Sequence, residues 1–379
     1  MQNLKANSNT LLISDAHFLE EQAMGGVQIC TQEYIQLLRQ TGFPLFIHPV
    51  HPTRSIAKRI LIRLQLDCFQ HYDYERIFSE ISRLIEEKNI FFLAINQINL
   101  APLAQLVQRS FKDRVKIILL SHGNETGDYL PYLVRSNPNG LGRFLHTYRL
   151  GRHLLMESSL YTHSIDLTLC ISELEQDINY WLGARKILFI PRTFSPEFLG
   201  WSPKRGRVGF VGTLNHFPNS KGLEMVLDAL CQRSQQNTGM EFRIVGGGTE
   251  TGIEFERKYP FVKYLGRLGD EELKNEAATW SIFLNPVFWY SRGASTKLAT
   301  GINWGLPILS TRQGNRGYSW SKGIIEACES PEDMAAKILS WSSDSSKLSE
   351  MAEQTRKVAG SGETLSELAE KLKRELEGL

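Results

Sequence analysis

The second half of the chain contains glycines and a lysine spaced as in a phosphate-binding turn. Residues 209–230, GFVGTLNHFPNSKGLEMVLDAL, read as an apolar strand, a turn at Gly212 and Thr213, and a polar loop that ends at Lys221 before a helix. Glycine lets the backbone approach a ligand closely, and the free N–H groups at a helix start attract anions. Lys221 could therefore contact a diphosphate, although an ordinary turn with a solvated lysine explains this segment equally well.

Two further turns follow apolar segments. Gly246, Gly247 and Gly248 come directly after the sequence FRIV, so a ligand could lie against their backbone, although glycine triplets also simply make turns. In the later sequence YLGRL, Arg267 and Leu268 follow a glycine, where backbone groups could read the edge of a base. An ordinary strand end is an equally good interpretation of this second turn.

A third candidate anion site lies in residues 291–311, SRGASTKLATGINWGLPILST. Small residues precede a helix that is predicted to end at Gly305, because glycine favours a helix C-terminus and Pro307 blocks continuation. Free amides at the start of this helix, nearby hydroxyl groups and Lys297 would together stabilise a phosphate-sized anion.

The segments around these turns alternate between predicted strands and predicted helices, as in βαβ units. Apolar runs at 11–14, 91–95, 115–120, 208–211, 242–245 and 282–284 alternate with helical patterns. Parallel α/β sheets bind ligands at the carboxyl ends of their strands, which is where the turns lie. The stretch 191–204 contains three prolines and is predicted to be a linker, since 379 residues exceed one ordinary domain.

Composition limits the class of protein further. With 42% hydrophobic residues and a net charge of +2, the chain is an ordinary folded protein, and bulk charge does not indicate nucleic-acid binding. The five cysteines include no C-x-x-C pair, which favours buried thiols in a reducing compartment and gives no sign of zinc. The N-terminus has no signal-peptide core and no apolar run is long enough to span a membrane, so we expect a cytoplasmic protein.

From about residue 164 to 317 the chain resembles the GT-B glycosyltransferases of the family 1 and family 4 type. The resemblance rests on CISELEQDINYWLG, FIPRTFSPEF, FVGTLNHFPNSKG, IVGGG, YLGRL and GLPILST, which occur in that family's order. It implies an α/β GT-B fold with two Rossmann-like doubly wound domains facing across a cleft. Residues 1–190 would form the acceptor-side domain, 205–355 the nucleotide-sugar donor domain, and 356–379 a C-terminal helix that packs back on the first domain.

The resemblance continues more thinly in the first half of the chain. Gly25 and Gly26 open an amphipathic helix, as in the family's glycine-rich loop near the donor diphosphate. The strand IILLSHGNE brings His122 to the place from which the family presents a residue to the transferred sugar. The alternative for His122 is a loop histidine that caps local backbone.

The chain also departs from the family's pattern. Many retaining members carry two glutamates eight residues apart, and those positions hold Arg292 and Thr300 here. Thr213 stands where an arginine often pairs with the lysine that corresponds to Lys221. The sequence GASTKLATGINWGLP instead resembles a subgroup in which Lys297, with Arg292 nearby, would supply charge to the diphosphate and residues 314–317 would line the site.

The resemblance and the turns together define a candidate site. The predicted catalytic residues are His122, Lys221 and Lys297. The predicted donor-binding residues are Gly25, Gly26, Gly212, Thr213, Gly246, Gly247, Arg267, Leu268, Arg292, Gly293, Ala294, Ser295, Thr296 and Thr300. No metal and no cofactor are expected, since the nucleotide-diphosphate sugar is a co-substrate and no Asp-x-Asp pair is present.

The implied activity is sugar transfer to a glycan or lipid-linked acceptor, with retention of configuration, in surface polysaccharide or glycoconjugate synthesis. Residues 54–64 and 143–156 alternate basic and apolar residues at helical spacing, as in helices that lie on anionic lipid at the inner face of a membrane. The alternative is a solvated helix whose apolar stripe faces the core. A catalytically silent GT-B partner or chaperone and a sugar-nucleotide epimerase are the competing functions.

Overall fold

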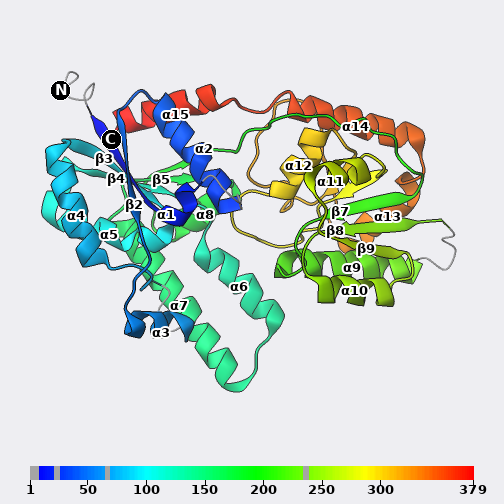
Figure 1. Ribbon diagram of the computed structural model, residues 1–379, viewed down its shortest axis with the longest axis horizontal. Helices are drawn as coiled ribbons and strands as arrows, with labels where there is room; N and C mark the ends of the chain where they lie inside the picture. Colours follow the sequence, from blue (N-terminus) through cyan, green and yellow to red (C-terminus); the bar gives the residue numbers. More distant parts are fainter. Residues whose placement is uncertain (1–7, 21–25, 65–68, 234–238) are drawn as a thin grey trace. The chain divides into compact units, whose positions relative to one another are not determined.

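The computed structural model describes residues 8–20, 26–64, 69–233 and 239–379 (Figure 1). Two compact units account for the chain. Unit 1 contains residues up to Arg192, the short segment Arg292–Ala294 and the C-terminal segment Thr364–Leu379. Unit 2 contains Thr193–Ser291 and Ser295–Glu363.

Unit 1 alternates strands with helices. Its strands are β1 (Asn9–Asp15), β2 (Leu45–Val50), β3 (Ile90–Asn96), β4 (Lys116–Leu120), β5 (Leu167–Cys170) and β6 (Ile187–Phe189). Its helices are α1 (Ala16–Leu19), α2 (Gly26–Gln40), α3 (Ile56–Arg63), α4 (Tyr74–Glu87), α5 (Pro102–Phe111), α6 (Glu125–Ser136), α7 (Gly140–His163), α8 (Leu174–Trp181) and α15 (Leu365–Glu377).

The sheet of unit 1 is parallel and buried on both faces. Its six strands follow the order β2-β1-β3-β4-β5-β6. Successive side chains of β1 alternate between two hydrophobic clusters: Leu11 and Ile13 pack with α4 and α5, whereas Leu12 packs with α2 and α15. This alternation confirms the predicted doubly wound α/β class, because a strand with period two can bury both faces only when helices cover both.

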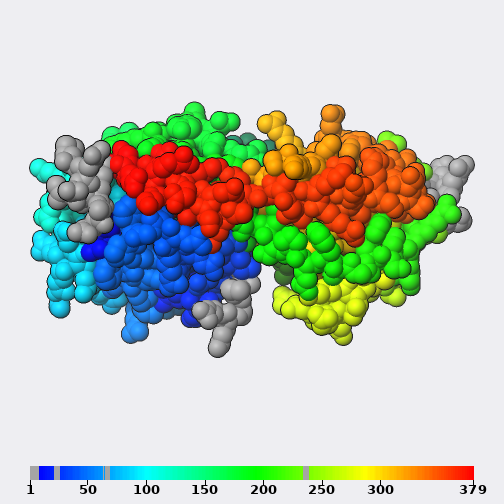
Figure 2. All heavy atoms as spheres, turned by 90° about the horizontal axis from the view of Figure 1, so that it is seen from above, coloured from blue at the N-terminus to red at the C-terminus, as the bar shows by residue number. Residues whose placement is uncertain are grey.

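Helix α15 belongs to unit 1 although it ends the chain. Leu368 and Leu372 are buried in the same cluster as Tyr34 of α2, and Lys186 pairs with Glu375 at 2.6 Å. Figure 2 shows the red C-terminal segment lying along the blue surface of the N-terminal region. The predicted single helix from 356 is wrong at its start, because α14 runs through Ala359 and α15 begins only at Leu365, after a new cap.

Unit 2 repeats the same alternation. Its strands are β7 (Arg207–Val211), β8 (Glu241–Val245), β9 (Val262–Gly266), β10 (Ile282–Leu284), β11 (Ile308–Ser310) and β12 (Glu326–Ala327). Its helices are α9 (Phe217–Arg233), α10 (Thr249–Lys258), α11 (Asp270–Ala277), α12 (Thr296–Trp304), α13 (Pro331–Trp341) and α14 (Ser345–Ala359).

The sheet of unit 2 has the strand order of a Rossmann fold. The order β12-β11-β10-β7-β8-β9 places the first strand of the unit, β7, between β8 and β10. Figure 1 shows α9 and α10 below the strands β7, β8 and β9 and α14 above them. In such a sheet the chain leaves β7 in one direction and β10 in the other, so their carboxyl ends mark the ligand-binding crevice.

The proline-rich stretch predicted as a linker lies on unit 2. The backbone N–H groups of Glu197 and Leu199 donate to the carbonyl oxygens of Asn303 and Trp304 at 2.8 and 3.1 Å. The ring of Phe194 stacks on Tyr318 with centroids 5.0 Å apart. The segment after Arg192 is therefore anchored by backbone pairing to the end of α12.

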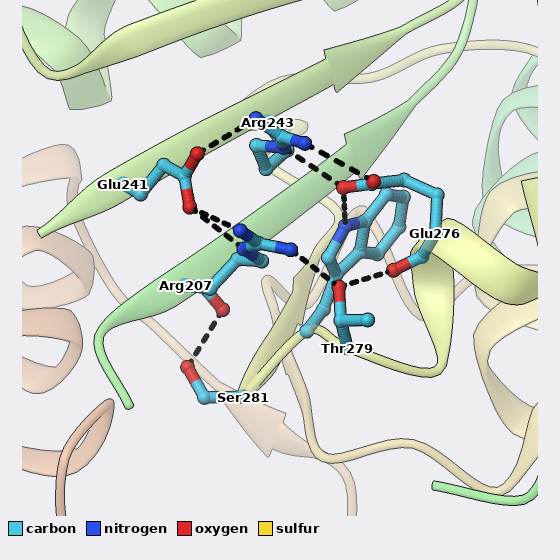
Figure 3. Close-up of polar contacts among 7 residues, drawn as sticks. Arg207, Glu241, Arg243, Glu276, Thr279 and Ser281 are labelled. Atoms are coloured by element: carbon cyan, nitrogen blue, oxygen red, sulfur yellow. Dashed lines mark hydrogen bonds and ion pairs between the residues drawn. The ribbon is translucent and has the colours of Figure 1, made fainter. Parts of the chain in front are cut away.

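A network of ion pairs joins the amino ends of β7 and β8 to α11, at the opposite edge of the sheet from the glycine turns (Figure 3). Glu241 accepts from Arg207 at 2.7 Å and from Arg243 at 2.7 Å. The guanidinium of Arg243 also donates to both carboxylate oxygens of Glu276, at 2.9 and 3.2 Å, and the indole of Trp280 donates to one of them. Every charged member of this network thus has a partner of opposite sign.

We expect the Glu276→Gln variant to lose about 1 to 3 kcal/mol of the free energy of unfolding, because an amide cannot accept both Arg243 hydrogen bonds. Burial opposes ionisation of Glu276, but the bonds from Arg243 and Trp280 outweigh it and lower the pKa of the carboxyl. The stabilisation is therefore present at neutral pH and fades as pH falls through that lowered pKa.

Urea unfolding at several pH values measures this difference. The exposed Glu271 on the same helix is the control, since its contact with Lys274 is at 3.7 Å and a surface pair contributes little. Equal losses for Glu276→Gln and Glu271→Gln, or a gap that widens as pH falls, would contradict the structural role of the network.

Candidate functional site

The glycine turns meet at the carboxyl ends of β7, β8 and β9 in unit 2. The N–H of Gly212 donates to Val245 at 2.9 Å, and the N–H of Gly246 donates to Gly266 at 2.8 Å. Gly246 has a φ of +142°, and a Cβ there would overlap the carbonyl oxygen of Gly212. Glycine is required at Gly246 because two backbone segments touch there.

Gly247, the next glycine, lies against the side chain of Arg267. A Cβ on Gly247 would lie 3.0 Å from Nη2 and 3.1 Å from Nε of Arg267, and 3.4 Å from Oγ1 of Thr213. Gly247, Arg267 and Thr213 are therefore neighbours, as the sequence predicts for one site. The half-buried Leu268 follows Arg267 in the chain.

Lys221 lies inside helix α9 and not in a loop before it. The helix begins at Phe217, with Pro218 in its first turn, where the missing N–H of proline is tolerated. The ammonium of Lys221 pairs with Glu224 one turn later at 2.7 Å. The predicted loop was wrong because Gly222 suggested a turn, whereas the glycine is needed inside the helix: a Cβ there would overlap the carbonyl oxygen of Pro286.

The Lys297 side chain lies beside the first glycine turn, since a Cβ on Gly212 would be 3.3 Å from its Cδ. Its Nζ donates to Oδ1 of Asn219 at 2.6 Å, and Nδ2 of Asn219 donates to the carbonyl oxygen of Thr213 at 2.8 Å. The same ammonium lies 5.9 Å from the ring centroid of Phe210 on β7. Burial, with a smaller contribution from the Arg316 guanidinium, lowers the pKa of Lys297 to about 7. The fold therefore holds a partly dehydrated cation beside Gly212.

The start of helix α12, next to Lys297, is capped by a side chain. Ser295 is the N-cap, and its Oγ accepts from the N–H of Leu298 at 3.4 Å. The buried amide of Asn285, directly after β10, donates to Oγ of Ser295 at 3.1 Å and to the carbonyl oxygen of Gly314 at 2.7 Å. Asn285, at the carboxyl end of β10, thus holds the capping side chain of Ser295 in place.

Helix α12 ends where the sequence predicts, and the hydroxyl of one predicted site residue is hydrogen-bonded within the helix. Gly305 terminates the helix in a left-handed conformation with φ of +69°, as predicted. Thr296 is exposed in the first turn. The hydroxyl of Thr300 donates to the carbonyl oxygen of Thr296 at 3.0 Å, so it is bonded within its own helix.

Residues 292–294 belong to unit 1 and are held by carboxylates. The guanidinium of Arg292 pairs with Glu125, and its backbone N–H donates to Asp128 at 3.2 Å. The N–H of Gly293 donates to the buried Glu175 at 2.7 Å. The positive charge of Arg292, at a position where the resemblance leads one to expect glutamate, is therefore matched by carboxylates of α6, and Ala294 follows in the same segment.

His122 is a neutral histidine at the carboxyl end of β4. Its Nε2 lies 2.6 Å from Oδ1 of Asn96, whose amide nitrogen already donates to Ser14 and Thr31. Oδ1 of Asn96 must therefore accept, which puts the proton on Nε2 and leaves Nδ1 as an acceptor. Burial, followed by the charges of Arg292 and Arg192, lowers the pKa of His122 to about 3.

The predicted residues thus fall into two groups. Unit 1 brings His122 beside Gly293, since a Cβ on Gly293 would lie 2.9 Å from the carbonyl oxygen of His122. Unit 2 brings Lys297 and the glycine turns together. Gly26 is the exposed first residue of α2, and Gly25 lies outside the described residues.

Several polar residues of these groups were missed from the sequence: Asn96, Glu125, Asp128, Glu175, Asn219 and Asn285. Asn96 ends β3 and Asn285 directly follows β10, so a polar residue where an apolar strand ends would have been a usable signal. Asn219 lies in a helical turn where the sequence predicts a loop, so the direction of its side chain could not be inferred.

Other predicted features concern metals, thiols and membranes. Among the described residues, no group of three or more His, Cys, Asp or Glu could hold a metal ion. Of the described cysteines, Cys30, Cys170 and Cys328 are buried free thiols and Cys231 is exposed. None of the helices in the described ranges combines the length and the apolar character needed to cross a bilayer.

Comparison with known proteins adds a family and several solved structures. Residues 205–344 match the family described as Glycosyl transferases group 1. A search of curated proteins finds no match.

Among solved structures, a sucrose-phosphate synthase from Thermosynechococcus elongatus aligns with a TM-score of 0.65 and 14% identity, covering 97% of this chain and 98% of that chain. A glycosyltransferase from Rickettsia africae ESF-5 aligns at 0.59 and 13%, covering 98% of both chains. A TarM variant from S. aureus, in complex with Fondaparinux, alpha-GlcNAc-glycerol and UDP, aligns at 0.52 and 12%, covering 76% of this chain and 55% of that chain. At such identities the likeness shows the fold, and it confirms the predicted GT-B architecture.

Proposed function

We propose that this chain, which has a GT-B fold and matches the family Glycosyl transferases group 1 over residues 205–344, transfers a sugar from a nucleotide-diphosphate sugar to an acceptor. The observation that carries this proposal is the cluster of Lys297, Asn219 and the Gly212 turn at the switch point of the Rossmann sheet. A partly buried cation beside a glycine turn and a helix start suits a diphosphate.

The proposed chemistry follows from where charge develops. When the sugar–oxygen bond breaks, negative charge grows on the departing diphosphate, and catalysis requires groups that bind this anion more strongly than the donor. Lys297 and the free amides at the start of α12 would supply that stabilisation. The backbone at Gly246 and Gly247, with Arg267, would hold the rest of the nucleotide.

Unit 1 would supply hydrogen-bonding groups that bind the sugar. The neutral His122 has its Nε2 proton committed to Asn96, so its Nδ1 can accept a hydrogen bond from a sugar hydroxyl. Glu125 and Asp128, which hold Arg292, bring further oxygen acceptors close to this histidine in the chain. We propose that these groups of unit 1 bind hydroxyl groups of a sugar.

The finer assignments are proposals of the same kind. The acceptor would be a glycan or a lipid-linked molecule, the configuration would be retained, and the reaction would need no metal. The S. aureus TarM complex, with UDP and a glycosylated glycerol, supports a product of this type by analogy of fold. A cytoplasmic location, at the inner face of a membrane, would suit surface polysaccharide or glycoconjugate synthesis.

The test is release of nucleoside diphosphate by the purified chain. We expect one member of a panel of nucleotide-diphosphate sugars to raise the unfolding temperature and to be turned over slowly in water, and faster when an acceptor is added. EDTA should leave the rate unchanged. Stabilisation by no donor, and no diphosphate released from any, would contradict the proposal.

A catalytically silent GT-B protein is the second candidate. It is favoured by Arg292 and Thr300 at the positions where the resemblance leads one to expect glutamates, and by the way carboxylates and helix backbone occupy their side chains. Donor binding in the panel without any diphosphate release, with or without acceptors, would select this function. Conversion of the donor into an isomer in the absence of acceptor would instead indicate an epimerase.

A further inference from the structure

Helix α3 is an amphipathic helix whose apolar side chains are not buried in the hydrophobic core. It is eight residues long and contains no buried residue among those described. Ile56, Ile60 and Leu64, spaced four residues apart on one side, are among the most exposed large apolar side chains of the protein, with Ile56 at 75%. A helix this short is unstable in water by itself, and the apolar stripe does not face the core.

The hairpin of α6 and α7 presents a second exposed apolar stripe. Leu141, Phe144, Tyr148 and Leu155 recur at spacings of three, four and seven, so they share one side of α7, and three of them are 66% to 73% exposed. The opposite side of α7 packs on α6: the ring centroids of His146 and His153 lie 6.0 and 5.6 Å from that of Tyr129. The stripe therefore points outward.

The sequence around the two stripes is mostly basic, and the nearest carboxylate paired with α3 is that of Asp73, 3.8 Å from the ammonium of Lys58. Residues 34–66, which contain α3, include no Asp or Glu, and neither do residues 129–156, which contain the distal part of the hairpin. Arg54 and Arg59 are exposed beside the first stripe, and Arg143 is exposed beside the second. Figure 1 shows α3 and the α6–α7 hairpin at the same lower end of unit 1.

We propose that α3 and the outer side of α7 form a docking surface for an anionic lipid bilayer. Exposed apolar side chains beside Arg54, Arg59 and Arg143 match the boundary between acyl chains and negatively charged headgroups. A second copy of the chain is a poorer occupant, because the same face would bring like charges together. The proposal rests on the membrane location proposed above and specifies its surface, but it does not depend on the transferase activity.

Flotation of the full chain with vesicles tests the docking surface. The protein should float with vesicles that contain phosphatidylglycerol and remain behind with phosphatidylcholine alone, and high salt should release part of it. Changing Arg54, Arg59 and Arg143 to Gln should weaken binding to anionic vesicles by about fivefold per residue.

An apolar variant separates burial in lipid from simple charge attraction. Leu141→Ser, Phe144→Ser and Tyr148→Ser together should weaken vesicle binding by at least about tenfold, because each buried CH₂ contributes to membrane affinity. Ile324→Ser in unit 2 is the matched control, since Ile324 is 67% exposed and lies outside both segments; it should bind like the parent chain. All variants should unfold at the parent temperature.

Three results would overturn the proposal: equal flotation with neutral and anionic vesicles, no effect of the triple serine variant, or a concentration-dependent dimer without lipid that this variant abolishes. The last result would identify a second copy as the occupant. UDP binding, measured by calorimetry on the same samples, reports on the proposed donor site separately, so failure of one proposal is distinguishable from failure of the other.

Discussion

The Lys297→Met variant should bind UDP about tenfold to a hundredfold more weakly than the parent protein, because it loses a charge-assisted contact of about 1.5 to 3 kcal/mol. Methionine keeps most of the side-chain length while removing the ammonium that contacts Asn219. Calorimetry with UDP as the probe measures the change. Lys221→Met should have a smaller effect, since Lys221 lies along α9 and is paired with Glu224.

The pH dependence of UDP binding gives a sharper form of this prediction. Burial lowers the pKa of Lys297 to about 7, so the free protein carries this charge below that pH and loses it above. A diphosphate binds the protonated form, so the affinity of the parent protein should fall as pH rises through 7. The ratio of parent to variant affinity should shrink over the same range, which removes any contribution from titration of UDP itself.

The Lys297→Met substitution should not lower the stability of the folded protein. The Lys297 ammonium has its pKa lowered on folding, so between pH 7 and the usual lysine value the unfolded chain binds more protons. Stability contributed by this site therefore rises with pH across that interval, and at pH 7 and below the buried charge opposes folding. The methionine variant should unfold at an equal or higher temperature. Loss of stability, or unchanged UDP affinity, would contradict a binding role for Lys297.

Much of the architecture could be predicted because the apolar runs that form buried strands can be recognised from the sequence alone. The apolar runs at 11–14, 91–95 and 208–211 all lie within observed strands, and the helix stop at Gly305 is where the sequence places it. Burial of parallel strands on both faces produces continuous apolar runs, which are visible in one dimension. β2 was missed because LFIHPV contains a histidine and a proline, which are tolerated on this edge strand.

The site itself could be predicted only in part. The glycines were identified because positive φ and close backbone approach leave a residue-type signature, as Gly246 illustrates. The partners of Lys297 and His122 were not identified, since Asn219 is 78 residues from Lys297 and Asn96 is 26 residues from His122. Such pairs depend on which strands are neighbours in the sheet, and spacing along the chain does not contain that information.

Gly246→Ala should reduce UDP affinity about tenfold to a hundredfold, because displaced backbone groups would lose hydrogen bonds to the charged diphosphate of about 1.5 to 3 kcal/mol. A methyl group at Gly246 would overlap the carbonyl oxygen of Gly212, and the residue has a φ of +142°, which L residues rarely adopt. Neither backbone segment can move aside as a flexible side chain would. The turns after β7 and β8 would separate, and the Gly212 backbone would shift relative to Lys297.

Gly266→Ala is the matched control for this substitution. Gly266 ends the neighbouring strand β9 and also has a positive φ, +70°, but a Cβ there meets no atom within 4 Å. It should cost about 1 to 2 kcal/mol of stability from backbone strain and leave UDP affinity nearly unchanged. If both variants lost affinity to the same extent, strain at the sheet edge and not the contact between the two turns would control the site. If neither lost affinity, the nucleotide would not bind against these turns.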